Sequence, residues 1–221
     1  MEQNILENFS PDETTVVICC AGMGTRLGIG TTKALLDING APLIIRQLEQ
    51  LKEFDDIRIV VGFQAERLIQ VVKEYRRDIV FAFNYDYEST GVVDSLQKGL
   101  LASRKYVISM DGDVLTNPDD FKAFTQFRGE CLAVSKITSD EPVKVHIKEG
   151  YVTLLSKDSG NMQWPGIVKI QLEKLWNDSS HVYELLNKQL PLKAFNIRSR
   201  TIDTQDDYDK AVEWFGRGQV D

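Results

Sequence analysis

The chain has 221 residues, of which 43% are hydrophobic and 27% charged, so it has enough apolar material for a core and is not wholly disordered. Its formal net charge is −7, which argues against a general nucleic-acid-binding protein. An acidic surface still allows a phosphorylated small ligand in a locally basic pocket.

The three cysteines, Cys19, Cys20 and Cys131, fit neither a disulfide framework nor a metal-binding spacing. No apolar run reaches the roughly 18 residues that a membrane helix needs. The first residues, "MEQNILENFSPDE", are acidic and lack the apolar segment of a signal peptide. We therefore expect a cytoplasmic protein that binds neither membranes nor nucleic acid.

From residue 15 to residue 113, segments with the patterns of strands and helices alternate. Strands are predicted at residues 15–20, 57–62, 78–84 and 105–113, and helices at residues 41–54, 64–77 and 92–103. This alternation indicates βαβ units and a mainly parallel sheet.

After about residue 130 the pattern is richer in strands. We predict strands at residues 131–137, 166–171 and 192–197, helices at 172–178, 181–190 and 204–215, and a β-hairpin over residues 143–157 that turns at Glu149-Gly150. No linker rich in Pro, Gly or Ser separates the halves. The prediction is one α/β domain over residues 1–221, with residues 1–14 as a flexible extension. Its sheet is Rossmann-like, doubly wound, mixed and mostly parallel, with a C-terminal hairpin elaboration.

The first strand runs into a glycine-rich loop, "ICCAGMGTRLG", at residues 18–28. Its spacing is not that of the dinucleotide-binding fingerprint, and the second strand lacks the acidic residue at its end. The P-loop pattern fails as well. An ordinary tight turn remains an alternative. However, Arg26 and Lys33 flank the loop, and backbone N–H groups with two cations suit a polyphosphate ligand.

Three aspartates are candidate ligands for a divalent cation. Asp111 and Asp113 stand at the carboxyl end of the strand at 105–113, where open α/β sheets bind their ligands. The alternative for Asp-Gly-Asp is a simple turn. Asp203 precedes the last helix, and Thr204 with Asp207 already fits a capping box, which leaves Asp203 free for another role.

Together these motifs resemble the nucleotidyltransferases that couple nucleoside triphosphates to sugar phosphates and related phosphate esters. The family signature is G-x-G-T-R followed by Pro-Lys, and this chain has Gly22, Gly24, Thr25, Arg26 and Lys33, with Thr32 at the proline position. The segments "KALLDINGAPLI", "VVGFQAERL", "DGD" and "IDTQDDYDKA" are also similar, so the resemblance covers residues 15–215. The element "TKALLDINGAP" is most similar to the branch of phosphocholine and phosphonate cytidylyltransferases. A nucleotide-diphospho-sugar transferase-like fold is implied.

The resemblance also implies roles for individual residues. Mg²⁺ is held by Asp113 and Asp203, with Asp111 as a further candidate. The acceptor phosphate is contacted by Lys144. The nucleotide is bound by Ala21, Gly22, Gly24, Thr25, Arg26, Lys33, Asn84, Ser95 and Asp111, among which Arg26 and Lys33 hold the triphosphate and, with Lys144, act in catalysis.

Base and acceptor remain open at this point. Gly91 and Val92 stand where many relatives carry paired asparagines, which leaves the choice of base uncertain, and Ser95 fits a helix surface nearly as well. Trp164 suits a quaternary ammonium by cation–π contact, with Glu141 nearby, although it also suits simple packing.

The expected reaction couples CTP to a small phosphate or phosphonate, with Mg²⁺ as cofactor and pyrophosphate as product. The acceptor is phosphocholine-like, an aminoalkyl phosphonate or an amino-acid-derived phosphate. One alternative is a sugar-1-phosphate or MobA-like transferase that uses another NTP. Another is a non-catalytic nucleotide sensor, against which the presence of Arg26, Lys33, Asp113 and Asp203 argues. The exposed face of the hairpin at residues 143–156 is a candidate contact in a homodimer.

Overall fold

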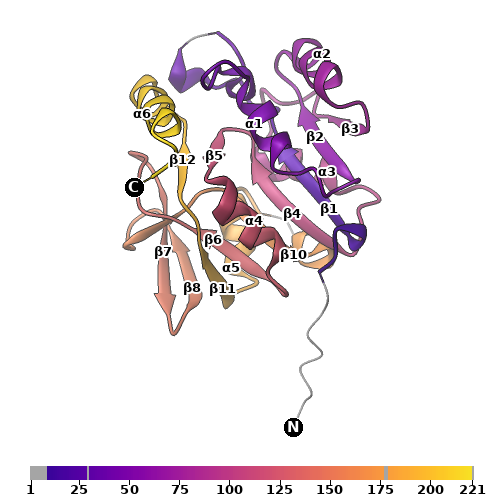
Figure 1. Ribbon diagram of the computed structural model, residues 1–221. Helices are drawn as coiled ribbons and strands as arrows, with labels where there is room; N and C mark the ends of the chain where they lie inside the picture. Colours follow the sequence, from indigo (N-terminus) through magenta and orange to yellow (C-terminus); the bar gives the residue numbers. More distant parts are fainter. Residues whose placement is uncertain (1–8, 29, 177–178, 221) are drawn as a thin grey trace.

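Figure 1 shows the computed structural model, which describes residues 9–28, 30–176 and 179–220. Within these residues a ten-stranded sheet has the order β3-β2-β1-β4-β10-β6-β11-β8-β7-β9. Its strands are β1 (Thr14–Cys19), β2 (Ile57–Val61), β3 (Ile79–Phe83), β4 (Tyr106–Asp111), β6 (Cys131–Val134), β7 (Val143–Lys148), β8 (Tyr151–Ser156), β9 (Met162–Trp164), β10 (Ile167–Gln171) and β11 (Leu192–Asn196). The predicted α/β class and doubly wound mixed sheet are confirmed.

The N-terminal half of the sheet is parallel, because β1 pairs with β2 and β4, and β2 pairs with β3, all in the same direction. Every residue of β1 except Cys19 is buried, which explains its run of threonine, valine and isoleucine. Side chains alternate between the two faces, so Val16 and Ile18 join one core and Val17 the other.

Helices cover both faces of the sheet (Figure 1). One core includes residues from α1 (Leu43–Glu49), α2 (Ala65–Tyr75) and α4 (Pro118–Gln126). The other includes α3 (Val92–Leu100) and α5 (Val182–Asn187). Gly99 lets α3 lie close to the sheet, since a Cβ there would stand 2.5 Å from Val17 Cγ1. No helix among the described residues is long and apolar enough to cross a membrane.

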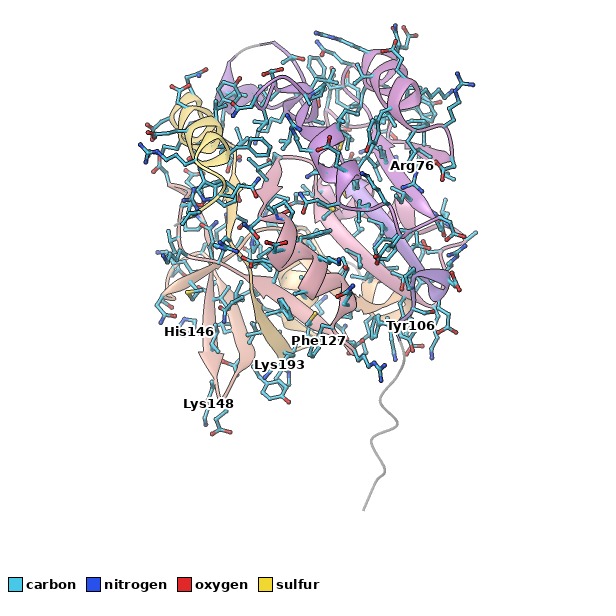
Figure 2. The ribbon with its side chains drawn as sticks, viewed as in Figure 1. Arg76, Tyr106, Phe127, His146, Lys148 and Lys193 are labelled. Carbon is cyan, nitrogen blue, oxygen red and sulfur yellow. The ribbon has the colours of Figure 1, made fainter. Side chains whose placement is uncertain are left out.

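In the C-terminal half, β10 is antiparallel to both β4 and β6, and β11 is parallel to β6. Strands β7 and β8 form the predicted hairpin, and its turn residues Glu149 and Gly150 both have positive φ. Figure 2 shows Lys148 near the hairpin tip. Strand β9 pairs with β7, and its Gln163 exchanges two backbone hydrogen bonds with Ser135, the residue after β6. This half of the sheet therefore closes on itself.

The structure differs from the prediction in several elements. Helix α4 was not predicted, although its N-terminal signal is visible: the Asn117 side chain accepts from two helix N–H groups and Pro118 follows it. Helix α1 ends at Glu49, earlier than expected. The helix predicted at 172–178 is a 3-10 turn, Leu172–Leu175, and residues 177–178 lie outside the described residues.

The chain ends also refine the prediction. Of the expected extension at residues 1–14, residues 1–8 lie outside the described residues. The rest is folded: the ring centroids of Phe9 and Tyr106 lie 3.9 Å apart, Pro11–Glu13 forms a 3-10 turn, and Thr14 begins β1. At the other end, α6 (Gln205–Gly216) follows a small antiparallel pair, β5 (Val114–Thr116) with β12 (Ser199–Thr201).

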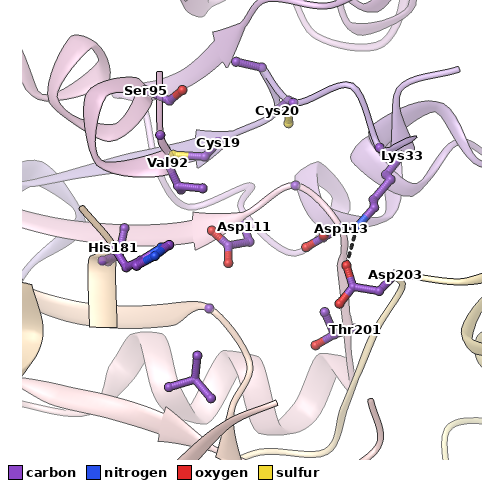
Figure 3. Close-up of a pocket in the computed structure, with 18 of the residues that line it drawn as sticks. Cys19, Cys20, Lys33, Val92, Ser95, Asp111, Asp113, His181, Thr201 and Asp203 are labelled. Atoms are coloured by element: carbon purple, nitrogen blue, oxygen red, sulfur yellow. Dashed lines mark hydrogen bonds and ion pairs between the residues drawn. The ribbon is translucent and has the colours of Figure 1, made fainter. Parts of the chain in front are cut away.

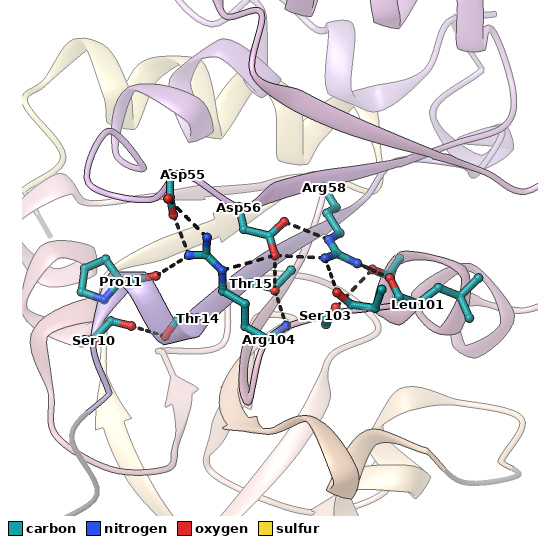
Figure 4. A network of polar contacts seen from close by, with 12 residues as sticks. Ser10, Pro11, Thr14, Thr15, Asp55, Asp56, Arg58, Leu101, Ser103 and Arg104 are labelled. Atoms are coloured by element: carbon teal, nitrogen blue, oxygen red, sulfur yellow. Dashed lines mark hydrogen bonds and ion pairs between the residues drawn. The ribbon is translucent and has the colours of Figure 1, made fainter.

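Charged side chains join the elements at the amino end of the parallel strands (Figure 4). Arg58 donates to both carboxylate oxygens of Asp56 at 3.0 Å and to the backbone carbonyls of Gly99, Leu101 and Ala102. Burial alone would raise the pKa of Asp56, but the hydrogen bonds from Arg58 and Thr15 lower it below its usual value. Together these contacts fasten β1, β2 and the end of α3 to one another.

Candidate active site

A cavity of about 580 Å³ lies at the carboxyl ends of β1 and β4 (Figure 3). Its wall is assembled from the glycine-rich loop, the start of α3, the end of β4, the segment before β7 and the segment between β12 and α6. This is the edge at which open α/β sheets bind ligands. Twelve of the residues predicted for the site line it: Ala21, Gly22, Gly24, Thr25, Arg26, Lys33, Ser95, Asp111, Asp113, Glu141, Trp164 and Asp203.

The glycine-rich loop is held in an open conformation against β2. The Ala21 carbonyl accepts from Phe63 N at 3.0 Å, and Gly62 lies so close that a Cβ there would be 2.8 Å from Ala21 O. Gly24 and Gly28 have positive φ values of 61° and 71° at the two ends of a 3-10 turn, Thr25–Leu27. At Gly22 a Cβ would meet nothing within 4 Å, so backbone at this point is accessible from the cavity.

Lys33 stands between two of the predicted metal ligands. Its Nζ lies 2.8 Å from Asp113 Oδ2 and 2.5 Å from Asp203 Oδ1. Burial lowers the pKa of Lys33, but the two carboxylates outweigh burial and raise it overall. The lysine stem runs along Gly24, where a Cβ would be 3.1 Å from Lys33 Cγ. The structure thus brings Lys33 together with Asp113 and Asp203, which lie 80 and 170 positions further along the chain.

Asp203 is available for this cluster because other residues cap α6. Thr204 Oγ1 accepts from Asp207 N, and the Asp207 carboxylate accepts from Thr204 N. The capping box predicted from the sequence is confirmed. Arg26 donates to Asp203 at 2.8 Å and to Glu141 at 3.3 Å, but its side chain is 56% exposed, so it remains accessible at the cavity mouth.

Asp111 points toward the centre of the cavity (Figure 3). The described residues offer its carboxylate no hydrogen bond, and Gly166, with φ of 81°, packs so closely that a Cβ would be 2.2 Å from Oδ2. Burial, together with the neighbouring charge of Asp113, raises the pKa of Asp111 well above its usual value. A cationic ligand group would relieve this unfavourable environment.

Among the described residues, no three acidic, histidine or cysteine side chains already converge as a preformed metal site. Asp113 and Asp203 nevertheless share Lys33, so both face one point that holds a positive charge. Protein-bound Mg²⁺ is commonly held by one or two carboxylates together with substrate phosphates. The donor set fits a cation that arrives with a nucleotide.

Asn84 and Ser95 have different positions. Ser95 lines the cavity, whereas Asn84 is buried behind it. The Asn84 amide donates to Ser95 Oγ and Thr90 Oγ1, each at 2.9 Å, and its carbonyl oxygen accepts from Lys98 at 2.8 Å. Asn84 therefore orients the loop and the serine hydroxyl, and does not itself line the cavity.

Lys144, which was predicted to contact the acceptor phosphate, does not line the cavity. Its ammonium donates to the carbonyl of Asp158 at 3.1 Å, and Lys144 is absent from the described cavity wall. Lys157, on the segment after β8, lines the cavity instead and donates to the Glu141 carbonyl at 3.2 Å. The fold of the hairpin decides between two lysines that look alike in the sequence.

Aromatic side chains also line the cavity. Trp164 is fixed there by a hydrogen bond from its Nε1 to Ile167 O at 3.0 Å. Sequence reasoning missed Tyr87, His181 and Tyr183, of which the last two stack with ring centroids 5.5 Å apart. No sequence signal marks them, because they lie on segments that only the fold brings to the cavity.

The sequence model of the MobA-like NTP transferase domain family matches residues 16–161. A choline-phosphate cytidylyltransferase from Streptococcus pneumoniae is 36% identical over 107 residues, which are 46% of each chain. A bifunctional protein GlmU from a Sulfurovum species is 30% identical over 101 residues, 45% of this chain and 23% of the relative. These alignments span less than half the length of either curated relative.

Solved structures share the fold over most of the chain. The inositol-1-phosphate CTP transferase from T. maritima has a TM-score of 0.78 at 18% identity, covering 96% of this chain and 98% of that one. The CTP:phosphocholine cytidylyltransferase LicC from Streptococcus pneumoniae has a TM-score of 0.74 at 23% identity, covering 92% and 99%. Both comparisons show that the topology is shared.

Proposed function

The chain belongs to the family of MobA-like NTP transferase domains, and from that premise we propose that it transfers a cytidylyl group from CTP to a small phosphate or phosphonate, releasing pyrophosphate. The acceptor is phosphocholine-like, an aminoalkyl phosphonate or an amino-acid-derived phosphate. The observation that carries the proposal is the contact of Lys33 with Asp113 and Asp203 beside an open glycine-rich loop. That arrangement supports binding of a triphosphate with its cation.

In the proposed reaction an acceptor oxygen forms a bond to the α-phosphorus of CTP while the bond to the pyrophosphate oxygen breaks. A phosphate monoester is already anionic near pH 7, because its second pKa is about 6, so no general base is needed. A cysteine nucleophile is not expected, since burial raises the pKa of the Cys19 and Cys20 thiols. Catalysis then rests on positioning and on neutralising charge.

Asp113 and Asp203 are the proposed ligands of Mg²⁺, with Asp111 available beside them. When bound, the cation supplies positive charge to the triphosphate oxygens as the leaving pyrophosphate gains negative charge. Without ligands, Lys33 neutralises the same two carboxylates. On nucleotide binding its ammonium turns to the phosphate oxygens, and Arg26 reaches them from the exposed mouth of the cavity.

For the acceptor, we assign the phosphate to Lys157 in place of Lys144, because Lys157 lines the cavity. Trp164, Tyr183 and the carboxylates of Asp111 and Glu141 provide aromatic faces and negative charge nearby. Such a set suits an ammonium group by cation–π and ionic contacts. This supports an acceptor that carries a positive charge as well as a phosphate or phosphonate.

A second candidate function is a nucleotidyltransferase that acts on a sugar 1-phosphate with another NTP. The residues at positions 91 and 92, Gly91 and Val92 in place of paired asparagines, leave the choice of base open and so allow this candidate. A third possibility, a non-catalytic sensor, would bind an NTP in the same cavity without turnover.

The test is pyrophosphate release in the presence of Mg²⁺. CTP, UTP, ATP, GTP and dTTP are each combined with phosphocholine, 2-aminoethylphosphonate, phosphoamino acids, inositol phosphate and hexose 1-phosphates. We expect release only with CTP and an acceptor that carries an amine. Release with another NTP and a hexose 1-phosphate would support the second candidate. NTP binding without release in any combination would support the sensor.

A further inference from the structure

Strand β3 is the open edge of the large sheet, at the right of Figure 1. At the opposite end, β9 is joined back to the chain after β6 by the Ser135–Gln163 bridge. Strand β3 pairs with β2 on one side, and no described strand pairs with its other side. Its outward backbone N–H and C=O groups are therefore available to another strand.

The sequence of this edge lacks the usual protection. Residues 79–83 read "IVFAF", with no charge and no proline, and their pairing with β2 contains no bulge. Exposed edge strands are normally blunted by such features, and an uncharged apolar β-segment without them is an aggregation hazard. Val80 is 53% exposed, Phe83 41% and Tyr85 80%, so apolar surface surrounds the free edge.

The hydrogen-bond register determines which groups face outward. Asn84 N donates to Val61 O at 2.8 Å, so residue 84 points toward β2. Backbone polarity alternates along a strand, so residues 80 and 82 also point inward while 79, 81 and 83 point outward. A second copy of β3 can lie antiparallel to the first, related to it by a two-fold axis at Phe81. The outward-facing residues then pair with one another: residue 79 of one copy faces residue 83 of the other, and residue 81 faces residue 81.

The charged residues that flank β3 also favour the antiparallel direction. The edge is preceded by Arg76, Arg77 and Asp78, and because Arg76 and Asp78 form an ion pair at 2.7 Å, Arg77 leaves this end with a net positive charge. Asp86 and Glu88 follow the edge and make its other end acidic. In the antiparallel arrangement the basic end of one strand lies beside the acidic end of the other, whereas a parallel arrangement would place like charges together. We propose that β3 is covered by β3 of a second copy of this chain, so that the two large sheets become continuous across a two-fold axis.

This interface differs from the one expected from the sequence. The hairpin at residues 143–156 is partly covered at both edges, because residues 143–145 of β7 pair with β9 and residues 151–152 of β8 pair with β11. In the described part of the ten-stranded sheet, β3 is unpaired on one side along its whole length, whereas each hairpin strand is paired on both sides over part of its length. A two-fold interface uses the same surface on both copies, as the self-matching register requires.

The test combines the oligomeric state with a register-specific cross-link. Sedimentation velocity of the wild-type chain over a wide concentration range should show a reversible monomer–dimer equilibrium. In the proposed register Val80 of one copy faces Ala82 of the other in a non-hydrogen-bonded pair, whose Cα atoms lie about 4.5 Å apart and within reach of a disulfide. The variants Val80→Cys and Ala82→Cys are therefore prepared separately, mixed in equal amounts and oxidised.

We expect a disulfide-linked dimer from the mixture and far less from either variant alone, with the wild-type chain as the control for its own three cysteines. Circular dichroism of each variant establishes that it is folded. A wild-type chain that stays monomeric at every concentration would overturn the proposal. Equal cross-linking by the single variants, or a dimer that never cross-links in the mixture, would overturn the register and with it the interface.

Discussion

The two ends of the parallel strands carry similar residues in different settings. At the amino end, Arg58 and Arg104 contact Asp55, Asp56 and backbone carbonyl groups (Figure 4). At the carboxyl end, Lys33 and Arg26 form ion pairs with carboxylate side chains at the wall of a cavity (Figure 3). Cations at the amino end fasten the backbone, whereas those at the carboxyl end hold side chains that can exchange partners.

The comparison shows that the role of an ion pair depends on the other groups that its two side chains contact. Arg58 donates to carbonyls at the end of α3, so moving it would break contacts between elements. Among the described residues Lys33 donates only to Asp113 and Asp203, so under the proposed function phosphate oxygens would replace those acceptors without disturbing the fold. The following variants test this distinction.

The largest effect is expected from Asp113→Asn. The change keeps the size of the side chain and removes the negative charge of a carboxylate that we propose as a ligand of Mg²⁺. Turnover should fall by about three orders of magnitude or more, because several kcal/mol of charge stabilisation is lost. The measurement is pyrophosphate release, with urea unfolding as the check that the variant is folded. Unchanged release by the variant would refute the metal assignment.

Lys33→Met should weaken CTP binding by about 10- to 100-fold, because a hydrogen bond to a charged group contributes about 1.5–3 kcal/mol. Because the two carboxylates lose their neutralising partner, binding of Mn²⁺ alone should become tighter than in the wild type. Both quantities are measured at equilibrium, by calorimetry for CTP and by electron paramagnetic resonance for Mn²⁺. A variant with unchanged affinity for both would show that Lys33 has a purely structural role.

Arg58→Met sharpens the comparison from the other end of the sheet. It removes the closer of the two arginines that pair with Asp56, and it removes the donor to three backbone carbonyls at the end of α3, so the free energy of unfolding should decrease by about 2–3 kcal/mol. The kcat of the folded variant should match that of the wild type. Urea unfolding and pyrophosphate release give the two quantities. A variant of normal stability and reduced kcat would reverse the roles that we assign to the two ends.

Two lysines near the hairpin provide a matched pair. Lys157→Met should raise the KM for the acceptor by about tenfold, as expected for an exposed charge–phosphate contact of about 1.4 kcal/mol. Lys144→Met should leave KM unchanged, since that side chain contacts Asp158 outside the cavity. Steady-state kinetics with varied acceptor distinguishes them. An effect of Lys144→Met alone would restore the contact expected from the sequence.

The smallest effect concerns a buried cation whose contacts are backbone carbonyls and aromatic rings. Lys169 is buried and donates to the carbonyls of Phe124, Thr125 and Phe127, and burial lowers its pKa to about 8. In the unfolded chain the pKa is about 10.4, so between these values the unfolded state binds more protons. The stability of the wild type relative to Lys169→Met should therefore rise with pH in this window. A flat or falling difference in urea unfolding would contradict the lowered pKa.

The sequence predicts much of the fold because local signals and tertiary packing agree along β1 to β4. Val16, Val17 and Ile18 read as a buried strand and are one, and Glu149-Gly150 reads as a hairpin turn and is one. Helix α4 was missed although Asn117 and Pro118 are recognisable start signals. Its apolar periodicity is short, because Phe121 and Phe124 are its buried residues, and such a pattern is a weak helix signal.

At the site, prediction was best for residues that follow strands and weakest for residues that depend on packing. Asp111 and Asp113 were placed correctly at the sheet edge, since the end of a strand fixes their position. The choice between Lys144 and Lys157 depends on how the hairpin lies against the rest of the sheet. Asn84 was expected in the cavity but orients Ser95 from behind it. His181 and Tyr183 carry no local pattern at all.

The central claim is that the carboxyl end of the sheet is the nucleotide site and the amino end is not. The most direct measurement is hydrogen–deuterium exchange of the wild-type chain with and without CTP and Mg²⁺. We predict slower exchange in residues 20–34 and 111–113 on binding, and no change in residues 55–58 and 101–104. Protection at the amino end, or no protection in the glycine-rich loop when CTP is bound, would contradict the account.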